Sequence, residues 1–530
     1  MSQFFPDIAI PLILAGLLIF GLNKVRRFRN DRTTKLKGPA NPSWLFGVYR
    51  LINESEDSGT VYERWTSLYG PAFRVPGGFG SKRIVICDPR ASAHFYSKET
   101  FGYVQTSLAR TFIKNLFGRG LLWAEGESHR RQRKALSPAF SNAAIRKLTS
   151  VFYDSAYKMK AAWDSALDAD AGETLIDVQK WMNHISLDSV GIAGFGHDFH
   201  ALDGKTSPVV EVFDSFGSSD SSFLSRLVFF LGPVFPMLQN LPTKRNRMLT
   251  RLRNTMGDIA GELLARNRKM EEGKSVAEDK SIIGLLIKAE TTSSSLGMSQ
   301  EEILAQVNVL LLAGYETTSI SLTWALIELC RQPEKQQKLR EELSEFVGSD
   351  PSFDQLSTGL PYLESVVQEV LRLHPPVGET TRVATEDDIM PFSEPVTTAT
   401  GEQVSSLFIS KGTVVTSPIR YMNSAEAFWG PDSREFRPER WLEPDDHLKA
   451  KEIQGPRHIL TFSDGPRTCL GRSFALTEFK SVLTVLIRNY AFELPDGPNT
   501  KIEKHPSILP RPRLVGEVSA RLPLKVRRVE

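Results

Sequence analysis

The first strongly apolar stretch lies at the amino end, where residues 4–22 read FFPDIAIPLILAGLLIFGL. This stretch is long enough to cross a bilayer as a helix. Its Leu, Ile and Phe side chains favour insertion by about 4–7 kcal/mol, more than the roughly 3 kcal/mol that Asp7 would cost at the centre of a span. Basic residues follow the stretch from Lys24 to Arg32, whereas a cleaved signal peptide has them before its apolar core. We therefore expect residues 1–23 to form an uncleaved transmembrane anchor, with the rest of the chain in the cytosol.

The pattern after the anchor predicts a linker and one folded body. Residues 24–44 are basic and contain Pro39 and Pro42, which disfavour a helix, so we expect a stiff linker before a body over residues 45–530. Residues 72–87 (AFRVPGGFGSKRIVIC) predict two short strands around a Gly-rich turn. Residues 128–346 are mostly helical in period, and the last third mixes strands, helices and prolines. The predicted fold is one domain, mainly α with a smaller β-rich part.

The longest helical pattern begins at Ser299, where Glu302 completes a capping box, and continues to Arg331. It is apolar on nearly all sides near its middle, which predicts burial. Yet residues 313–318 (AGYETT) place a glycine, an acid and two threonines there, all poor choices for a buried helix. Two explanations stay open. The helix is kinked and its threonine hydroxyls bond to backbone carbonyls, or it opens to bring an alcohol and a carboxylate beside a reactive ligand.

A second helix, ending in LESVVQEVLRLHPP (363–376), places Glu369 and Arg372 one turn apart. If the pair were exposed, it would add little stability. Its Val and Leu neighbours indicate burial instead, and a buried pair needs further hydrogen bonds to offset lost hydration. Arg440, in FRPERW (436–441), is our candidate to supply them.

Composition excludes several classes of protein. The chain is 41% hydrophobic and 24% charged, which is ordinary for a globular protein, and its net charge of +3 is too small to indicate nucleic-acid binding. Cys87, Cys330 and Cys469 are far apart and odd in number, which argues against a disulfide framework and for a reducing compartment. Their spacing does not match a zinc site.

Cys469 lies in FSDGPRTCLGR (462–472), a polar and turn-rich setting. Three roles are open: a structural thiol, which would favour apolar surroundings; a nucleophile, with His458 as the nearest histidine in sequence; or a metal-bound thiolate. The third fits a loop in which Gly465 permits a turn and Gly471 keeps bulk away from a metal. The residues after Gly471 predict a helix whose N-terminus favours a thiolate.

The loop motif F-x-x-G-x-R-x-C-x-G resembles the haem-binding loop of cytochromes P-450, and its five specified positions arise by chance on the order of 10⁻⁴ times per chain. In this chain they are Phe462, Gly465, Arg467, Cys469 and Gly471. The other motifs follow in the family's order: AGYETT, the Glu369/Arg372 pair and Arg440. The resemblance implies that Glu369, Arg372 and Arg440 form a structural triad. The resemblance extends over the whole chain, most closely to fungal microsomal members. It implies the cytochrome P-450 fold, in which a long distal helix and a proximal cysteine loop sandwich haem b (iron protoporphyrin IX).

The resemblance also implies roles for single residues. Cys469 is the expected axial ligand of the haem iron, where a thiolate favours O–O cleavage. Thr317 and Glu316 match the pair that delivers protons through water, and Gly314 matches the position that opens the helix for dioxygen.

Other matches concern the haem propionates. Arg467 and Arg382 are their expected partners, because arginine gives strong charge-assisted hydrogen bonds. The family usually has W-x-x-x-R on a helix near residue 130, and here His129 stands where Trp is common, followed by Arg133. The surrounding HRRQRK (129–134) is either a solvated helix face or part of a cationic surface that docks an acidic flavoprotein.

The resemblance implies that this flavoprotein is an NADPH-cytochrome P-450 reductase, with cytochrome b5 as a further candidate donor, at the endoplasmic reticulum membrane. Segments expected to line the distal pocket (103–118, 306–317 and 376–381) are mostly apolar, which favours a hydrophobic small-molecule substrate. Residues 227–242 are also apolar, as either a core helix or an edge that dips into the bilayer. By analogy with fungal members we expect secondary metabolism of terpenoid, sterol or polyketide type.

Three functions are consistent with these features. The first is a monooxygenase that turns C–H into C–OH with dioxygen and two electrons. The second is an oxygen-independent haem-thiolate isomerase or dehydratase, against which the Glu316 and Thr317 pair argues. The third is a membrane-anchored haem-binding or lipid-binding protein without turnover, which predicts that no NADPH is consumed when a reductase is added.

Overall fold

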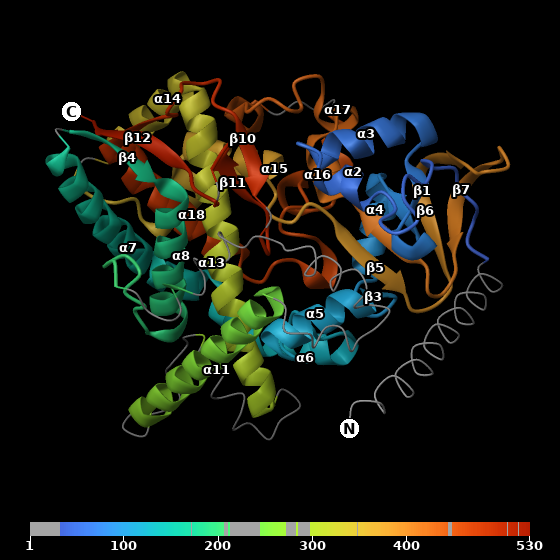
Figure 1. Cartoon of the computed structure of the whole chain (residues 1–530), viewed down its shortest axis with the longest axis horizontal. Coiled ribbons are helices and arrows are strands. Elements are labelled where there is room, and N and C mark those ends of the chain that lie inside the picture. The colour runs from blue at the N-terminus through green and yellow to red at the C-terminus, as the bar shows by residue number, and fades with distance from the viewer. Residues whose placement is uncertain are drawn as a thin grey trace, which may run out of the picture.

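The computed structural model describes residues 32–170, 172–205, 210–211, 244–271, 282, 284, 297–346, 348–443, 448–505, 507–517 and 519–529. A helical part lies on one side of Figure 1 and a smaller, strand-rich part on the other. The long helix α13 (Gln300–Arg331) runs through the middle of the helical part. The expected class, mainly α with a smaller β-rich part, is confirmed.

The other described helices are distributed over both parts of the fold, and several of them pack against α13. They are α2 (Tyr49–Asn53), α3 (Ser58–Tyr69), α4 (Pro89–Ser97), α5 (Ser107–Phe117), α6 (Gly126–Leu136), α7 (Asn142–Ala169), α8 (Val178–Phe195), α11 (Lys244–Glu271), α14 (Pro333–Ser344), α15 (Pro361–Leu373), α16 (Ile419–Ser424), α17 (Glu426–Trp429) and α18 (Arg472–Asn489).

The described strands form small sheets. They are β1 (Ala72–Pro76), β2 (Lys82–Ile86), β3 (Tyr103–Gln105), β4 (Glu173–Asp177), β5 (Thr380–Ala384), β6 (Asp388–Thr397), β7 (Gln403–Ile409), β8 (Val414–Ser417), β9 (Tyr490–Glu493), β10 (Ile502–His505), β11 (Arg511–Leu514) and β12 (Pro523–Arg528). The largest sheet has the order β1-β2-β8-β5-β3, and β10 and β11 form an antiparallel pair. The strands expected within residues 72–87 are β1 and β2, paired antiparallel as predicted. In the same sheet, β3 places Gln105 opposite Arg382 of β5.

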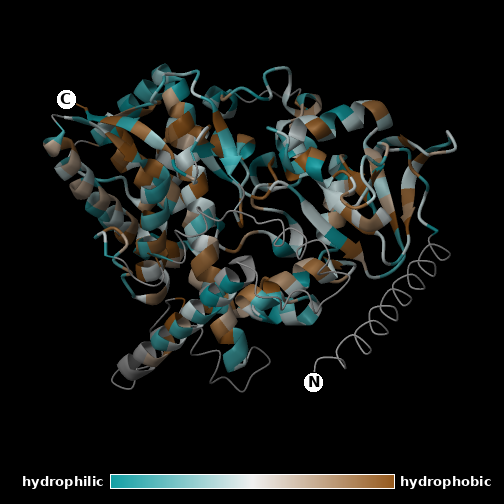
Figure 2. Cartoon of the chain, in the orientation of Figure 1, coloured by the Kyte–Doolittle hydropathy of each residue, from teal (hydrophilic) through white to brown (hydrophobic). Residues whose placement is uncertain are grey.

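Helix α13 begins as the sequence predicts. The Ser299 hydroxyl accepts from the Glu302 N–H at 3.2 Å, and the Glu302 carboxylate accepts from the Ser299 N–H at 3.0 Å, which completes the capping box. After α13 ends at Arg331, Pro333 is the first residue of the next helix, α14, a position that proline favours. Hydrophobic positions, brown in Figure 2, are frequent on α8 and α13, which pack against each other.

Gly314 has a packing role in this helix pair. A Cβ added at Gly314 would lie 2.7 Å from Cγ2 of Val190 on α8, so no side chain fits there. Helix α13 is continuous through this point. The absence of a side chain at Gly314 thus lets two central helices approach closely, a role that the sequence did not predict.

The amino-terminal region is only partly described. The expected anchor (1–23) and the apolar stretch 227–242 lie outside the described residues. In the expected linker, Leu36 is buried and forms a β-bridge with Thr398, and the Thr34 N–H donates to the Phe408 carbonyl at 2.9 Å. The folded body therefore begins before residue 45. Among the described helices, only α13 is long and apolar enough to cross a membrane, and most of that apolar stretch is buried in the protein.

An unusual acid lies where α8, α13 and α18 meet. Glu478 on α18 is fully buried, and its carboxyl oxygens accept no hydrogen bond that satisfies the usual geometry from any described residue. Burial raises the pKa of Glu478 well above its ordinary value, opposed by the nearby hydroxyls of Ser186, Thr318 and Ser189. The folded protein therefore holds a proton that the unfolded chain releases above about pH 4.5.

Because the folded pKa is raised, stability falls as pH rises from the unfolded value towards the folded one. Glu478→Gln keeps the side chain's shape but cannot ionise. We expect its thermal midpoint to vary less than that of the wild type between about pH 6 and 9, and to exceed the wild type at the upper end. Glu402→Gln, at an exposed position, is the matched control. An equal decline in Glu478→Gln and the wild type would contradict the buried neutral acid.

Candidate active site

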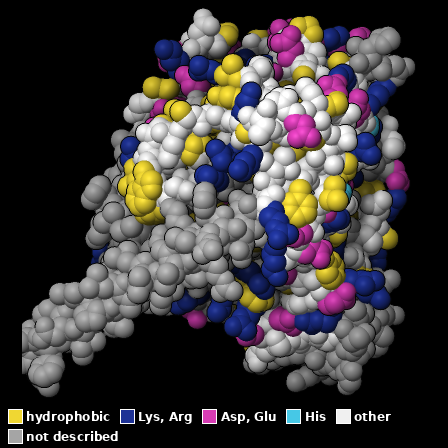
Figure 3. Space-filling view, turned by 90° about the vertical axis from the view of Figure 1, so that its right-hand side faces the viewer, with side chains coloured by type: hydrophobic (Ala, Val, Ile, Leu, Met, Phe, Trp, Pro, Cys, Tyr) yellow, Lys and Arg dark blue, Asp and Glu magenta, His cyan; other side chains and the backbone are white. Residues whose placement is uncertain are grey.

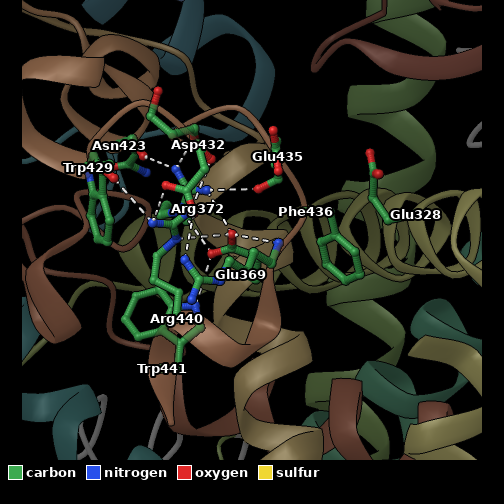
Figure 4. A network of polar contacts seen from close by, with 12 residues as sticks. Glu328, Glu369, Arg372, Asn423, Trp429, Asp432, Glu435, Phe436, Arg440 and Trp441 are labelled. Carbon is green, nitrogen blue, oxygen red and sulfur yellow. Dashed lines mark hydrogen bonds and ion pairs between the residues drawn. The ribbon is translucent and has the colours of Figure 1, made fainter. Parts of the chain in front are cut away.

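The Glu369/Arg372 pair on α15 is fully buried and well hydrogen-bonded (Figure 4). Arg372 donates to the two carboxylate oxygens of Glu369 at 2.8 Å each. Arg440 Nε lies 3.4 Å from Glu369, and the Trp441 indole donates to it at 3.0 Å. The Arg437 backbone N–H is a third external donor, also at 3.0 Å. The expectation that a buried pair would recruit further donors, Arg440 among them, is confirmed.

This pair is linked to the cysteine loop through Asn423. Arg372 donates to the Asn423 carbonyl at 3.0 Å. The Asn423 side chain accepts from the Leu460 N–H at 2.8 Å and donates to the Thr461 hydroxyl at 2.8 Å. Thr461 in turn donates to the Leu371 carbonyl at 2.6 Å. The residues directly before Phe462 are therefore fixed to α15 by a closed set of buried hydrogen bonds.

The cysteine loop itself depends on glycine. The Cys469 N–H donates to the Phe462 carbonyl at 2.8 Å, which closes the loop. Gly465 has φ +63°, and a Cβ there would lie 2.3 Å from the Tyr96 carbonyl oxygen, so only glycine fits. At Gly471, by contrast, an added Cβ would meet its nearest neighbour at 3.9 Å. The space beside Gly471 is therefore open, as expected for a residue that leaves room for a ligand.

The thiol of Cys469 is both accessible and surrounded. Its side chain is exposed, yet burial by nearby protein raises the pKa of the Cys469 thiol. The N–H of Gly471, at the start of α18, and the charges of Arg133 and Arg472 oppose this shift without cancelling it. The expected helix-terminus and cationic support is present, but desolvation outweighs it in the protein alone. A metal cation at the sulfur is what would complete deprotonation.

Two of the predicted arginines carry acid partners. Arg467 lies 2.6 Å from the Glu125 carboxylate and donates to the Ala124 carbonyl at 2.5 Å. Arg382 lies 2.7 Å from Glu99, a carboxylate with no exposed surface. The atom of Arg382 that faces Glu99 is Nε, whereas the Nε of Arg467 is buried and donates no hydrogen bond to any described residue. Glu99 and Glu125 were not identified from the sequence, since neither belongs to the motifs that we recognised.

The basic segment of helix α6 has one side facing the protein interior and one side facing solvent. His129 is buried and Arg133 half-buried, and the charge of Arg133 acts on Cys469. Burial, with the charges of Arg467 and Arg133, lowers the pKa of His129 to about 3, so the ring is neutral at physiological pH. Arg130 and Lys134 point to solvent. The structure thus gathers His129, Arg133 and Arg467 around the cysteine loop.

One face of α13 is open although the helix is mostly buried. Ala313 is exposed and Thr317, one turn later, is half-buried, whereas the neighbouring Leu312 and Tyr315 are buried. Thr317 donates its hydroxyl to the Ala313 carbonyl at 2.7 Å, as the first explanation for AGYETT required. The open face is what the second explanation required. The hydroxyl-to-carbonyl bond of the first explanation and the open face of the second therefore occur together, in a helix that runs unbroken from Gln300 to Arg331.

The structure does not bring Glu316 to the Thr317 hydroxyl. Its carboxylate is buried against the segment that leads into β11, 3.3 Å from Arg511, and the Ser507 hydroxyl and the Leu509 N–H donate to it at 3.3 and 3.4 Å. Burial raises the pKa of Glu316, and the Arg511 guanidinium opposes the shift. Arg511 lies 195 residues away in sequence, and only its position in the apolar segment ILPRPRLV could have suggested burial.

These groups fit a flat metal cofactor that carries carboxylates. The accessible thiol offers one metal ligand beside an uncrowded glycine. The buried Nε of Arg467 donates no hydrogen bond to any described residue, and with the neutral His129 ring nearby it suits an anionic group. The face of Ala313 and Thr317 offers a small residue and a hydroxyl. Haem fits this donor set.

Comparison with known proteins identifies the family. Residues 37–516 match the family model for cytochrome P450. The chain is 66% identical over 529 residues to cytochrome P450 monooxygenase claP of Ampulloclitocybe clavipes, covering 99% of this chain and 98% of the relative. It is 35% identical over 508 residues to cytochrome P450 monooxygenase 205 of Postia placenta (93% and 92% covered) and 32% identical over 554 residues to ganoderic acid synthetase of Ganoderma lucidum (97% and 99% covered).

The chain therefore belongs to the cytochrome P450 family, and it is an enzyme of the monooxygenase class. The resemblance that rested on the cysteine motif, AGYETT and the Glu369/Arg372 pair is confirmed at the level of the family. Haem is the cofactor of that family, in agreement with the donor set around Cys469.

The Glu316–Arg511 pair allows a test of the distal site by stability. Arg511→Met leaves a buried carboxylate without its cation, and we expect a loss of about 3–5 kcal/mol in the free energy of unfolding. Glu316→Gln combined with Arg511→Met removes both charges and should recover most of that loss. Chemical denaturation of the wild type, Glu316→Gln, Arg511→Met and the double variant measures the coupling. Equal losses in the single Arg511 variant and the double variant would show that the pair is not coupled.

Proposed function

We propose that this enzyme hydroxylates, or otherwise oxidises, a hydrophobic small molecule at haem held by Cys469. The observation that carries the proposal is the accessible Cys469 thiol, on which the charges of Arg133 and Arg472 act, in a chain of the cytochrome P450 family. Haem bound there supplies activation of dioxygen and transfer of one oxygen atom to the substrate. The protein supplies the ligand, the cofactor's orientation, the protons and the exclusion of water.

Each residue has a defined task in this proposal. The Cys469 sulfur would bind the haem iron, and the loop closed by the Phe462 carbonyl holds this sulfur in place. The haem propionates would be bound by four side chains: Arg467, Arg382, Arg133 and the His129 ring. Charge-assisted bonds from the arginines are the strongest of these contacts.

Proton delivery is assigned to α13. The Thr317 hydroxyl lies on the open face and holds a proton donor or a water at that face, while its own proton bonds to the Ala313 carbonyl at rest. Glu316 is the proposed proton source for the Thr317 side of α13. Its carboxylate is paired with Arg511, so it exchanges protons either through water or after separating from Arg511.

The electron donor in this proposal is an NADPH-cytochrome P450 reductase, with cytochrome b5 as a secondary donor. Support comes from α6: Arg130 and Lys134 are exposed on the same helix whose buried side carries His129 and Arg133. Arg131 is less available, because it pairs with Glu302 at 2.5 Å. An acidic flavoprotein docking here would be steered by charge and weakened by salt.

The proposed location is the endoplasmic reticulum membrane, with residues 1–23 as the anchor and the body in the cytosol. Large hydrophobic side chains near the start of the body support membrane contact: Trp44 is 62% exposed, and Tyr49 and Leu51 are also exposed. Figure 3 views this side and shows hydrophobic side chains interspersed with both basic and acidic ones.

The proposed substrate class is a terpenoid, sterol or polyketide of fungal secondary metabolism. The relatives are fungal monooxygenases, and one is named for ganoderic acid synthesis. Within the expected pocket segments, the Arg110 guanidinium lies 4.0 Å over the Trp123 ring, and Glu379 does not line a pocket as a free charge, because it pairs with Arg83 at 2.6 Å. Little fixed charge is left for a charged substrate.

Labelled dioxygen tests the reaction class. Membranes with the enzyme, a reductase and NADPH are offered a panel of terpenoids, sterols and polyketides under ¹⁸O₂, and products are analysed by mass spectrometry. We expect one ¹⁸O atom in the product. Product formed without ¹⁸O would favour the isomerase or dehydratase alternative. No NADPH consumption with any substrate would favour a binding protein without turnover.

Thr317→Ala tests the proton role of α13. Removing the hydroxyl leaves the site's shape nearly intact but removes the proton-holding group. We expect NADPH consumption to continue while more of it yields hydrogen peroxide and product falls by about 10- to 100-fold. Thr323→Ala, which removes a similar hydroxyl-to-carbonyl bond elsewhere on α13, is the matched control. Unchanged coupling in Thr317→Ala would remove Thr317 from the mechanism.

A further inference from the structure

Two buried carboxylates stand behind the arginines that would face haem. Glu99 follows α4 and lies against Arg382 of β5 at 2.7 Å, while Glu125 caps the start of α6 and lies against Arg467 at 2.6 Å. We propose that Glu99 and Glu125 are positioning residues of the haem site: they hold Arg382 and Arg467 ready for the propionates, and their charges lower the reduction potential of the iron. The inference rests on the proposed haem site and concerns residues outside its motifs.

Glu125 has the contacts of a rigid support. One carboxylate oxygen binds Arg467, and the other accepts from the Gln105 N–H at 2.9 Å. Gln105 is paired with Arg382 in the β3–β5 register, so the same carboxylate connects the cysteine loop to the strand that bears the second arginine. Arg467 also donates to the neighbouring Ala124 carbonyl. One side of the guanidinium is thereby occupied, and its Nε remains without a partner among the described residues.

Glu99 is a buried carboxylate whose nearest charged neighbours are arginines. It is fully buried, and neither carboxylate oxygen accepts a hydrogen bond of usual geometry from the part of the chain that the structure describes. Burial raises the pKa of Glu99, and the charges of Arg382, at 2.7 Å, and Arg467 oppose that shift, while Glu125 adds to it. The two arginines are therefore what favours the ionised form of Glu99 at this buried position.

Charge counting indicates why two acids are needed. Arg382, Arg467 and Arg133 bring three positive charges to one region. Burial lowers the pKa of Arg467, the charge of Arg382 adds to that effect, and Glu125 and Glu99 oppose it. Glu99 and Glu125 offset two of these charges before any cofactor is present. The cradle is then formed in advance, and the arginines need not be reoriented when propionates arrive. Negative charges this close also favour the oxidised, more positive iron over the reduced iron.

Substitution to Gln separates charge from position. Glu99→Gln and Glu125→Gln keep size and an acceptor oxygen but lose the charge, so we expect each to shift the reduction equilibrium of the iron about 4- to 10-fold towards the ferrous form, measured by spectroelectrochemistry of the holoprotein. Haem loss, followed by transfer to apomyoglobin, should stay within about 2-fold of the wild type. Glu127→Gln, exposed on the same helix and near Glu125, should change neither.

Substitution to Ala tests position. Glu125→Ala and Glu99→Ala leave an arginine without support, and we expect haem transfer to apomyoglobin at least about 10-fold faster than in the Gln variants. Unchanged potential in both Gln variants, or equal haem loss in the Ala and Gln variants, would overturn the assignment even though the wild type shows a thiolate-type spectrum. A wild type that binds no haem would instead overturn the proposed function, and this inference with it.

Discussion

The ion pair between Glu369 and Arg372 fixes the geometry on which the rest of the site depends. Neither side chain has exposed surface, so each charge must be satisfied entirely by protein groups. Arg372 reaches the carbonyls of Asn423 and Ser433, and Glu369 collects donors from the segment around Arg440. Through Asn423 the network continues to the residues directly before the cysteine loop. A loop rich in glycine and turns is rigid here because it is attached to a buried charge pair rather than to its own packing.

The protein contains several other buried acids, and their charges are stabilised to different extents by neighbouring groups. Glu369 is satisfied by many donors, whereas Glu316 relies on Arg511 and weaker contacts. Glu99 has cations but no hydrogen bonds of usual geometry, and Glu478 has only hydroxyls nearby, so its neutral form is favoured. These differences follow the cost of removing a carboxylate from water: donors and cations favour the ionised form, and where they are few the neutral form is favoured.

The sequence predicted local features well because they depend on neighbours in the chain. The capping box at Ser299, the strand pair within residues 72–87 and the Glu369/Arg372 spacing all follow from short-range patterns. The partners that were missed are distant in sequence: Arg511 for Glu316 and Glu99 for Arg382. Nothing local marks such contacts, because tertiary packing alone brings them together. The packing of Gly314 against α8 was hidden for the same reason.

The central claim is that Cys469 binds haem iron as a thiolate, and the carbon monoxide difference spectrum of the reduced, membrane-bound protein tests it most directly. The account predicts a strongly red-shifted Soret band in the wild type and its loss in Cys469→Ala. A band at the position typical of imidazole ligation in the wild type, or retention of the red-shifted band in Cys469→Ala, would contradict it.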